Sequence, residues 1–112
     1  MHEDERGLIK DLYVGDDCSA TLVTFNKDAV RGNHYHKETT QFDVVMKGKL
    51  IVFQNEKSEI LKYGDFARHN PNDKHAYKAL EDSVLLSICF GKRIGENYES
   101  DTFRLKDNDK LI

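Results

Sequence analysis

The sequence contains no tryptophan, one proline and two cysteines among its 112 residues. Cys18 and Cys89 are too few to form a disulfide framework in a chain of this size. No Cys-x-x-Cys pair indicates a zinc ion held by thiolates. We therefore expect two reduced thiols, as in a cytoplasmic protein.

Long apolar runs and an excess of one charge are also lacking. The segment from Met1 to Arg6 has no signal-peptide pattern, and no run is long enough to cross a bilayer. Seventeen basic and twenty acidic side chains give a formal net charge of −3, and no basic stripe is interleaved with aromatic residues. We expect a cytoplasmic protein whose partners are neither membranes nor nucleic acids.

The sequence has instead many short apolar segments separated by turn signals, and no helix of useful length is indicated. The expected strands cover residues 7–14, 20–25, 29–35, 41–46, 50–53, 60–63, 75–80 and 84–90. This spacing predicts an all-β, antiparallel sandwich or jelly-roll barrel. We expect one domain over residues 1–112.

Within that domain we expect an edge strand over residues 7–14, a core over about 20–90 and a polar tail over 91–112. Lys47-Gly48-Lys49 predicts a hairpin, because glycine takes the positive φ that tight turns need. The segment Val84 to Phe90 is apolar on both faces, which is typical of a strand buried in a sandwich or at a subunit interface. We therefore expect a homodimer.

Three histidines are candidate metal ligands. On a strand, His34 and His36 share one face with Cα atoms about 6.5 Å apart, and His75 follows a turn-rich segment as a third ligand. Two histidines at this spacing are also compatible with a half-exposed strand. Three imidazoles suit zinc, iron, manganese, nickel or copper, so the sequence predicts a divalent ion without naming it. We expect His2 and His69 to face solvent.

The sequence resembles the cupin family over about residues 30–90. The residues that match the first cupin motif are Gly32, His34, His36, Gln41 and Gly48, and those that match the second are Gly64, Pro71 and His75. Gln41 stands where the motif has a glutamate, Asp73 stands at a glycine position, and the spacing from Pro71 to His75 is one residue shorter than usual. The resemblance implies a double-stranded β-helix fold.

The fourth ligand has two candidates. A regular strand continuing past His36 would place Glu38 on the face of His34 and His36. Gln41 is favoured because it matches the motif position, but an odd spacing from His36 then requires a bulge or turn over residues 37–40. With Gln41 all ligands are neutral, so the ion keeps its +2 charge and favours anionic substrates.

A second resemblance concerns the substrate. Arg31-Gly32-Asn33-His34 is similar to the Arg-Gly-x-His stretch of the sugar-nucleotide cupins, which include 3,5-epimerases, 3,4-ketoisomerases and the zinc-bearing cupin of a capsule-synthesis reductase. The resemblance implies that His34 is a catalytic base and that Arg31 holds a nucleotide diphosphate. The ketoisomerases also have a histidine at the position of His36, which we therefore include as a catalytic candidate.

We expect a metal-binding enzyme that isomerises or epimerises a nucleotide-linked keto-sugar by removing a proton next to a carbonyl. One alternative is a dioxygenase that uses iron or a similar metal. Another is a cupin that binds a small ligand without catalysis.

Several residues have two interpretations each. Asp43 is either a structural carboxylate or a base, and the tyrosines are either packing residues or phenolic acids: Tyr63, Tyr77 and Tyr98. An oxygenase needs apolar cavity walls, and the candidates for core or wall are Phe42, Met46, Ile51 and Phe53.

Overall fold

The computed structural model describes residues 1–91 and 101–112, and nearly all elements in this part are strands. The strands are β1 His2–Asp4, β2 Gly7–Val14, β3 Cys18–Phe25, β4 Val30–Tyr35, β5 Thr40–Lys47, β6 Lys49–Gln54, β7 Lys57–Lys62, β8 Phe66–His69, β9 His75–Ala79, β10 Ser83–Phe90 and β11 Phe103–Arg104. A short 3₁₀ turn covers Asp107–Asp109.

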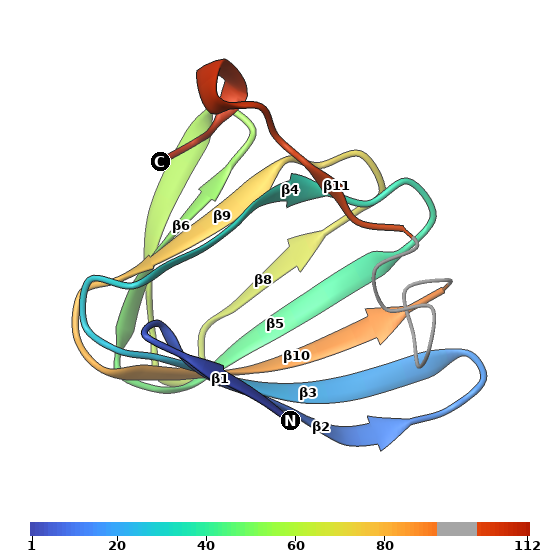
Figure 1. Ribbon diagram of the computed structural model, residues 1–112, viewed down its shortest axis with the longest axis horizontal. Coiled ribbons are helices and arrows are strands. Elements are labelled where there is room, and N and C mark those ends of the chain that lie inside the picture. The colour runs from blue at the N-terminus through green and yellow to red at the C-terminus, as the bar shows by residue number, and fades with distance from the viewer. Residues whose placement is uncertain (92–100) are drawn as a thin grey trace.

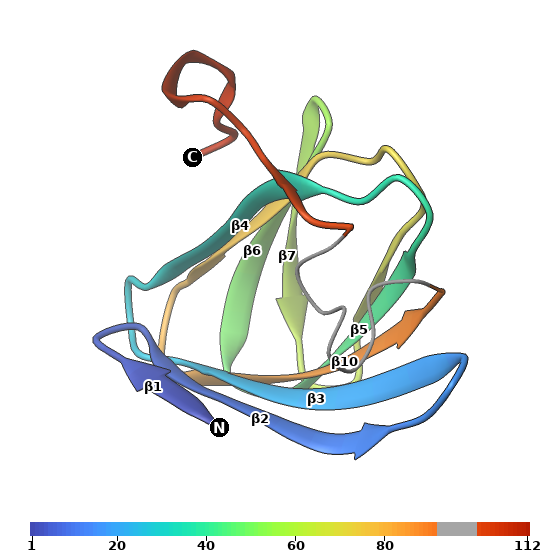
Figure 2. The same cartoon turned by 45° about the vertical axis from the view of Figure 1, so that its right-hand side comes forward.

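The strands form two sheets that face each other (Figures 1 and 2). The six-stranded sheet has the order β1-β2-β3-β10-β5-β8, and the five-stranded sheet has the order β11-β4-β9-β6-β7. Every strand pairing is antiparallel. The predicted all-β, antiparallel jelly-roll fold is therefore confirmed.

The space between the sheets is apolar in one part and polar in another. The buried apolar cluster contains Phe25, Val45, Leu50, Val52, Leu61, Tyr77, Ala79 and Leu85. Along β5 the inward side chains change from Gln41 and Asp43 to Val45, and along β9 they change from His75 to Ala79. The strands thus place polar side chains at one end and the apolar core at the other.

Gly48 joins two sheets rather than two paired strands, so the predicted hairpin is wrong. β5 lies in the six-stranded sheet and β6 in the five-stranded one. Gly48 has a φ of 87°, and a Cβ there would lie 2.4 Å from the carbonyl oxygen of Asp82. Glycine is required as expected, but for a corner between the sheets.

The strand over residues 7–14 is an edge along only part of its length, since the chain before it folds back as β1. His2 pairs with Ile9, and Asp4 pairs with Gly7. The turn between them is held by Arg6, whose backbone N–H donates to Asp4 Oδ1 at 2.9 Å. β1 therefore covers residues 7–9, and residues 10–14 remain at the edge of the sheet, as expected.

Other sequence expectations concern single residues. Phe42, Ile51 and Phe53 are only half-buried and Met46 is exposed, so none of the four belongs to the buried core. Cys18 and Cys89 are not joined by a disulfide bond. In the part of the chain that the structure describes, no helix is long and apolar enough to span a membrane.

Candidate functional site

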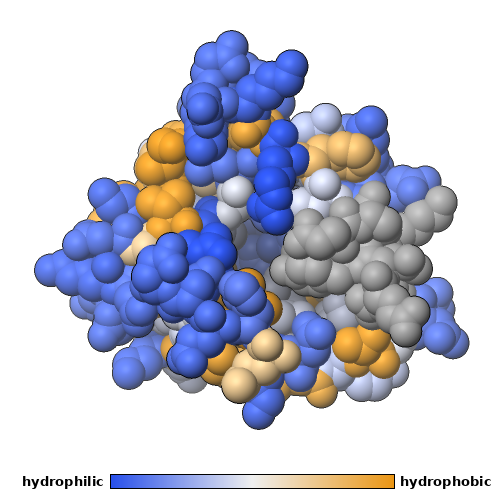
Figure 3. All heavy atoms as spheres, viewed as in Figure 1, coloured by the Kyte–Doolittle hydropathy of each residue, from blue (hydrophilic) through white to orange (hydrophobic). Residues whose placement is uncertain are grey.

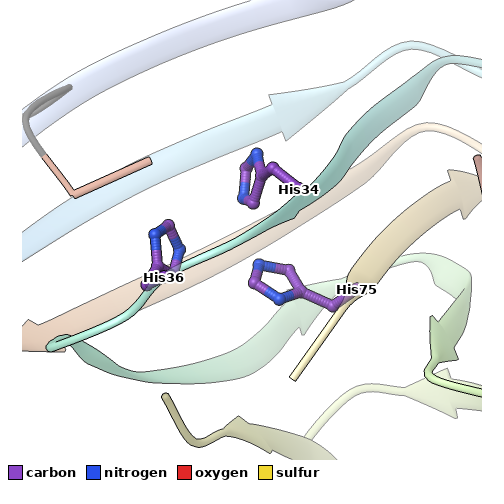
Figure 4. A group of neighbouring side chains, drawn as sticks. All are labelled: His34, His36 and His75. Carbon is purple, nitrogen blue, oxygen red and sulfur yellow. The ribbon is translucent and has the colours of Figure 1, made fainter. Parts of the chain in front are cut away.

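Three histidines converge between the sheets (Figure 4). His34 lies on β4, His36 follows that strand directly, and His75 begins β9. One ring nitrogen from each residue lies within 4.8 Å of the others. His36 and His75 are buried, whereas His34 is half-buried. The arrangement is one that can hold a metal ion.

A bulge in β4 sets this convergence. The pairing of β4 with β9 shifts between Gly32 and His34, so that His34 lies opposite His75. Asn33, the bulged residue, has a positive φ of 56°. A Cβ on Gly32 would lie 2.9 Å from the Cα of Ala76, so only glycine allows β9 to approach this closely.

The tautomer and the neutral charge of His75 suit it to bind a metal ion. Its Nδ1 donates to the backbone carbonyl of Asp73 at 3.0 Å, which leaves the lone pair on Nε2. Burial, together with the neighbouring His69 and His34, holds the pKa of His75 well below its ordinary value, so the ring is neutral near pH 7. Its Nε2 is buried and has no hydrogen-bond partner among residues 1–91 and 101–112.

His36 faces an acceptor oxygen at each ring nitrogen. Nδ1 lies 2.9 Å from the backbone carbonyl of Asp101, and Nε2 lies 3.0 Å from Oε1 of Gln41. A neutral imidazole has one N–H, so one nitrogen presents a lone pair to an oxygen lone pair. Either a second ring proton or a cation between His36 Nε2 and Gln41 Oε1 relieves this repulsion, so the residues fit a divalent ion.

Gln41 is held in place by Asp43 on the same face of β5. Its Nε2 donates to both carboxylate oxygens of Asp43, at 3.1 and 2.9 Å. Glu38, the alternative ligand, is exposed on the turn that carries the chain from β4 to β5. The structure therefore places Gln41, and not Glu38, beside the histidines.

Asp43 is fully buried and remains ionised. Burial by itself raises its pKa, but hydrogen bonding and charge from His69, with the hydroxyls of Tyr77 and Ser87, outweigh burial and bring the pKa of Asp43 to about 2. The hydroxyl of Tyr77 donates to Oδ2 of Asp43 at 2.5 Å. Of the two interpretations of Asp43, these contacts favour the structural carboxylate.

His69 was expected to face solvent, but it is fully buried, with 0% of its surface exposed. Its ring stacks on His75 with centroids 4.0 Å apart, and its Nε2 lies 2.7 Å from the hydroxyl of Tyr77. His69 lies two residues after the inward-facing Ala67 on β8, which is paired with β5. The period of two over residues 66–69 gives no signal for this burial, because the more apolar Phe66 is the residue that points outward.

A cavity of about 560 Å³ opens onto this cluster. Its lining includes three of the four predicted metal ligands, His34, Gln41 and His75, and also the predicted phosphate ligand Arg31. Arg6 and Arg104 line it as well. The face seen in Figure 3 is hollowed near its centre, and hydrophilic side chains predominate around the hollow.

Arg31 is buried at the wall of this cavity. Its Nη2 donates to the backbone carbonyl of Thr24 at 3.1 Å, and its guanidinium carbon lies 5.4 Å from the centre of the Phe25 ring. Of the tyrosines, Tyr77 lines the cavity, Tyr63 is exposed, and Tyr98 lies outside the described residues.

Comparisons with known proteins bear on the family and the fold. The family model described as "Cupin domain" matches residues 21–90, which is more than half of the chain. No curated protein sequence matches the chain significantly. Among solved structures, KdgF from Halomonas sp. is 26% identical with a TM-score of 0.70, over 76% of this chain and 78% of KdgF.

Two further solved structures share the fold at lower identity. The capsular polysaccharide assembling protein CapF from Staphylococcus aureus is 17% identical with a TM-score of 0.80; the match covers 95% of this chain but only 32% of CapF. An uncharacterised protein with a double-stranded β-helix domain from Klebsiella pneumoniae is also 17% identical, with a TM-score of 0.74 over 85% of both chains. The chain therefore spans about a third of CapF.

Proposed function

This chain belongs to the cupin family, and on that premise we propose that it binds a divalent metal ion and isomerises or epimerises a nucleotide-linked keto-sugar. The observation that carries the proposal is the shared cavity, in which His34, His75 and Gln41 lie with Arg31. One cavity thus joins groups suited to a metal ion with a cation suited to phosphate.

The metal ion would be held by His34, His36 and His75, with Gln41 as the fourth ligand. These four side chains bring no negative charge, so a bound ion would act as a Lewis acid with its full charge on a substrate oxygen. The buried Nε2 of His75 and the facing acceptors of His36 and Gln41 support this ligand set.

The arginines of the cavity support an anionic substrate. Arg6, Arg31 and Arg104 line it, and they outnumber its two aspartates, Asp11 and Asp43. Guanidinium groups bind phosphate oxygens in a bidentate manner. A nucleotide diphosphate linked to a sugar fits this chemistry. The likeness of fold to CapF, which is described as a capsular polysaccharide assembling protein, supports the sugar part of the proposal.

His34 is the imidazole that a substrate reaches, because it is half-buried and lines the cavity. A neutral imidazole takes a proton through its single lone pair, and the same lone pair binds a metal ion. In the metal-free form His34 therefore serves as the base, with His36 as its partner. In the metal-bound form both are ligands, and another group must accept the proton.

The dioxygenase alternative has less support. Its apolar cavity walls were sought in Phe42, Met46, Ile51 and Phe53, and none of these four residues lines the cavity. Other apolar residues do line the cavity, among them Ile9, Val23, Phe25 and Leu85, but so do three arginines, which an oxygenase does not need.

The first test is metal content and proton exchange, measured on protein purified without chelator and without a histidine tag. We expect a stoichiometric divalent ion. We also expect deuterium to enter next to the carbonyl of a nucleoside-diphosphate keto-sugar in D₂O. His34→Ala should abolish this exchange, because it removes a metal ligand from the metal-bound form and the base from the metal-free form. Full turnover in metal-free His34→Ala would remove the base assignment, and a metal-free active parent would favour a ketoisomerase-like mechanism.

The second test concerns the phosphate. Arg31→Ala should weaken nucleotide-sugar binding by roughly 10- to 100-fold, since hydrogen bonds to charged groups contribute about 1.5–3 kcal/mol. Arg68→Ala, which changes an exposed arginine on β8, is the matched control. Equal affinity in both variants would count heavily against a nucleotide-linked substrate.

A further inference from the structure

We infer that Asp43 is a positioning residue for the metal ion: it turns the Gln41 amide so that the carbonyl oxygen faces the histidines, and it supplies the negative charge of the site from one hydrogen bond behind the ligands. This inference rests on the metal site of the proposed function. A single carboxylate ligand can supply both an oxygen ligand and a negative charge. Here Gln41 would supply the oxygen and Asp43 the charge.

Hydrogen-bond chemistry fixes the direction of the Gln41 amide. An ionised carboxylate only accepts hydrogen bonds, so the group of Gln41 that faces both oxygens of Asp43 must be the NH₂. The carbonyl oxygen Oε1 must then point the other way, where it lies 3.0 Å from Nε2 of His36. The Gln41–Asp43 contact therefore decides that the amide presents an oxygen, and not a nitrogen, to the site.

Asp43 is itself held by groups that leave it little freedom. It is fully buried, Tyr77 donates to its Oδ2, and His69 Nε2 lies 3.3 Å from the same oxygen. Gln41 and Asp43 are two residues apart on β5, so both side chains point to the same face of the sheet. The strand and the hydrogen bonds together make a rigid support for the Gln41 amide.

This arrangement also makes glutamine the suitable residue at position 41. A glutamate there would place two carboxylates at the 2.9–3.1 Å distances that now separate Gln41 Nε2 from the Asp43 oxygens. Like charges that close repel strongly in a buried site. The favourable combinations are one amide and one carboxylate, in either order along the strand.

The two possible orders give a direct test with four proteins: the parent, Gln41→Glu, Asp43→Asn, and the double variant Gln41→Glu/Asp43→Asn. The affinity for Zn²⁺ is measured by chelator competition, and the visible spectrum of the Co²⁺-loaded protein reports the ligand set. We expect Asp43→Asn to lose about 10- to 100-fold in affinity, as for other residues that orient a ligand. Gln41→Glu alone should also weaken binding.

The double variant exchanges the amide and the carboxylate, so it should recover the parent affinity to within about threefold or exceed it. Asp65→Asn is the matched control, because it makes the same change at an exposed aspartate that accepts a hydrogen bond from the Lys62 backbone and does not line the cavity. We expect Asp65→Asn to keep the Zn²⁺ affinity within about threefold of the parent.

A measurement on the metal-free protein tests the Gln41–Asp43 contact independently of metal binding. In the parent, the side-chain NH₂ protons of Gln41 should exchange slowly with solvent in NMR spectra, and Asp43→Asn should make this exchange faster. A parent that binds no metal defeats the proposed function. A parent that binds metal, with Asp43→Asn equal to it in affinity or with a double variant no better than the single ones, overturns the role of Asp43.

Discussion

The two faces of the six-stranded sheet do not divide in the usual way between apolar and polar. On β5 and β10 the inward face carries the polar Gln41, Asp43 and Ser87 as well as the apolar Val45, Leu85 and Cys89, whereas the outward face carries large apolar residues. These outward residues are Phe42, Val44, Met46, Val84, Leu86, Ile88 and Phe90. Antiparallel sheets normally bury their apolar face and leave the polar face in water. The inward polar residues line the cavity. The outward apolar residues must be buried by a contact outside this sheet.

The outward face has features of a contact surface. Phe42 and Phe66 stack there with ring centroids 4.9 Å apart, and Phe66 and Phe90 are 59% and 51% exposed. Contiguous apolar patches on a protein surface mark interaction sites. We therefore place the homodimer, which remains a prediction, on this face.

The largest effect is expected on the inward face. His75→Ala should remove the stoichiometric metal ion, because it deletes the ligand whose Nε2 is buried without a hydrogen-bond partner in the described part of the chain. Metal content by mass spectrometry measures this. His2→Ala, which removes an exposed histidine, should keep the ion. Equal metal content in both variants would demote His75 to a structural residue.

The stability contributions of the two faces can be compared at two adjacent valines. Val45 points inward and is 0% exposed, whereas Val44 points outward and is half-buried. Val45→Ala should lower the free energy of unfolding by about 2 kcal/mol, from two lost methyl groups and the cavity they leave. Val44→Ala should cost less in dilute solution. Urea unfolding measures both, and equal losses would mean that the outward face is already covered.

The outward face is tested through the oligomeric state. Phe66→Glu should weaken dimerisation by at least about tenfold, or 1.4 kcal/mol, because it places a charge in an apolar contact. Ile60→Glu, at a comparably exposed position of β7 in the other sheet, is the control. Sedimentation measures the dimer fraction. A monomeric parent would remove the proposed interface.

The smallest effect concerns pH. Because the pKa of His75 is lowered in the folded protein, the unfolded state binds more protons, and stability declines as the pH falls through the ordinary histidine value near 6.5. The metal-free protein should lose about 0.7 kcal/mol from this group between pH 7 and pH 6. Unfolding at several pH values measures the loss. His75→Gln should flatten the profile, and an unchanged profile would contradict the lowered pKa.

The sequence predicts local features well and pairing across the barrel poorly. The period of two and the turn residues were sufficient to predict β3, β5 and β10, because they depend on neighbouring residues. The turn at Gly48 was assigned to a hairpin because a glycine with positive φ is required both in a tight hairpin and at a corner between two sheets. Which strand pairs with β6 is decided by distant residues on β7 and β9, which the local pattern does not contain.

The candidate site shows the same division. The convergence of His34, His36 and His75 matches their motif spacing, while their roles in binding and catalysis remain predictions. His69 was missed because its flanking residues, Arg68 and Asn70, are polar and exposed. Its burial results from the pairing of β8 with β5 and the stacking on His75. Both depend on tertiary packing rather than on local polarity.

The candidate ligands come from both sheets, and this has a mechanical consequence. His34 and His75 belong to the five-stranded sheet, whereas Gln41 belongs to the six-stranded one. An ion held by all of them would cross-link the two sheets, as a disulfide cross-links distant segments of a chain. Separation of the sheets would then require release of the ion, so a loaded protein should unfold more slowly and resist proteolysis longer than an empty one.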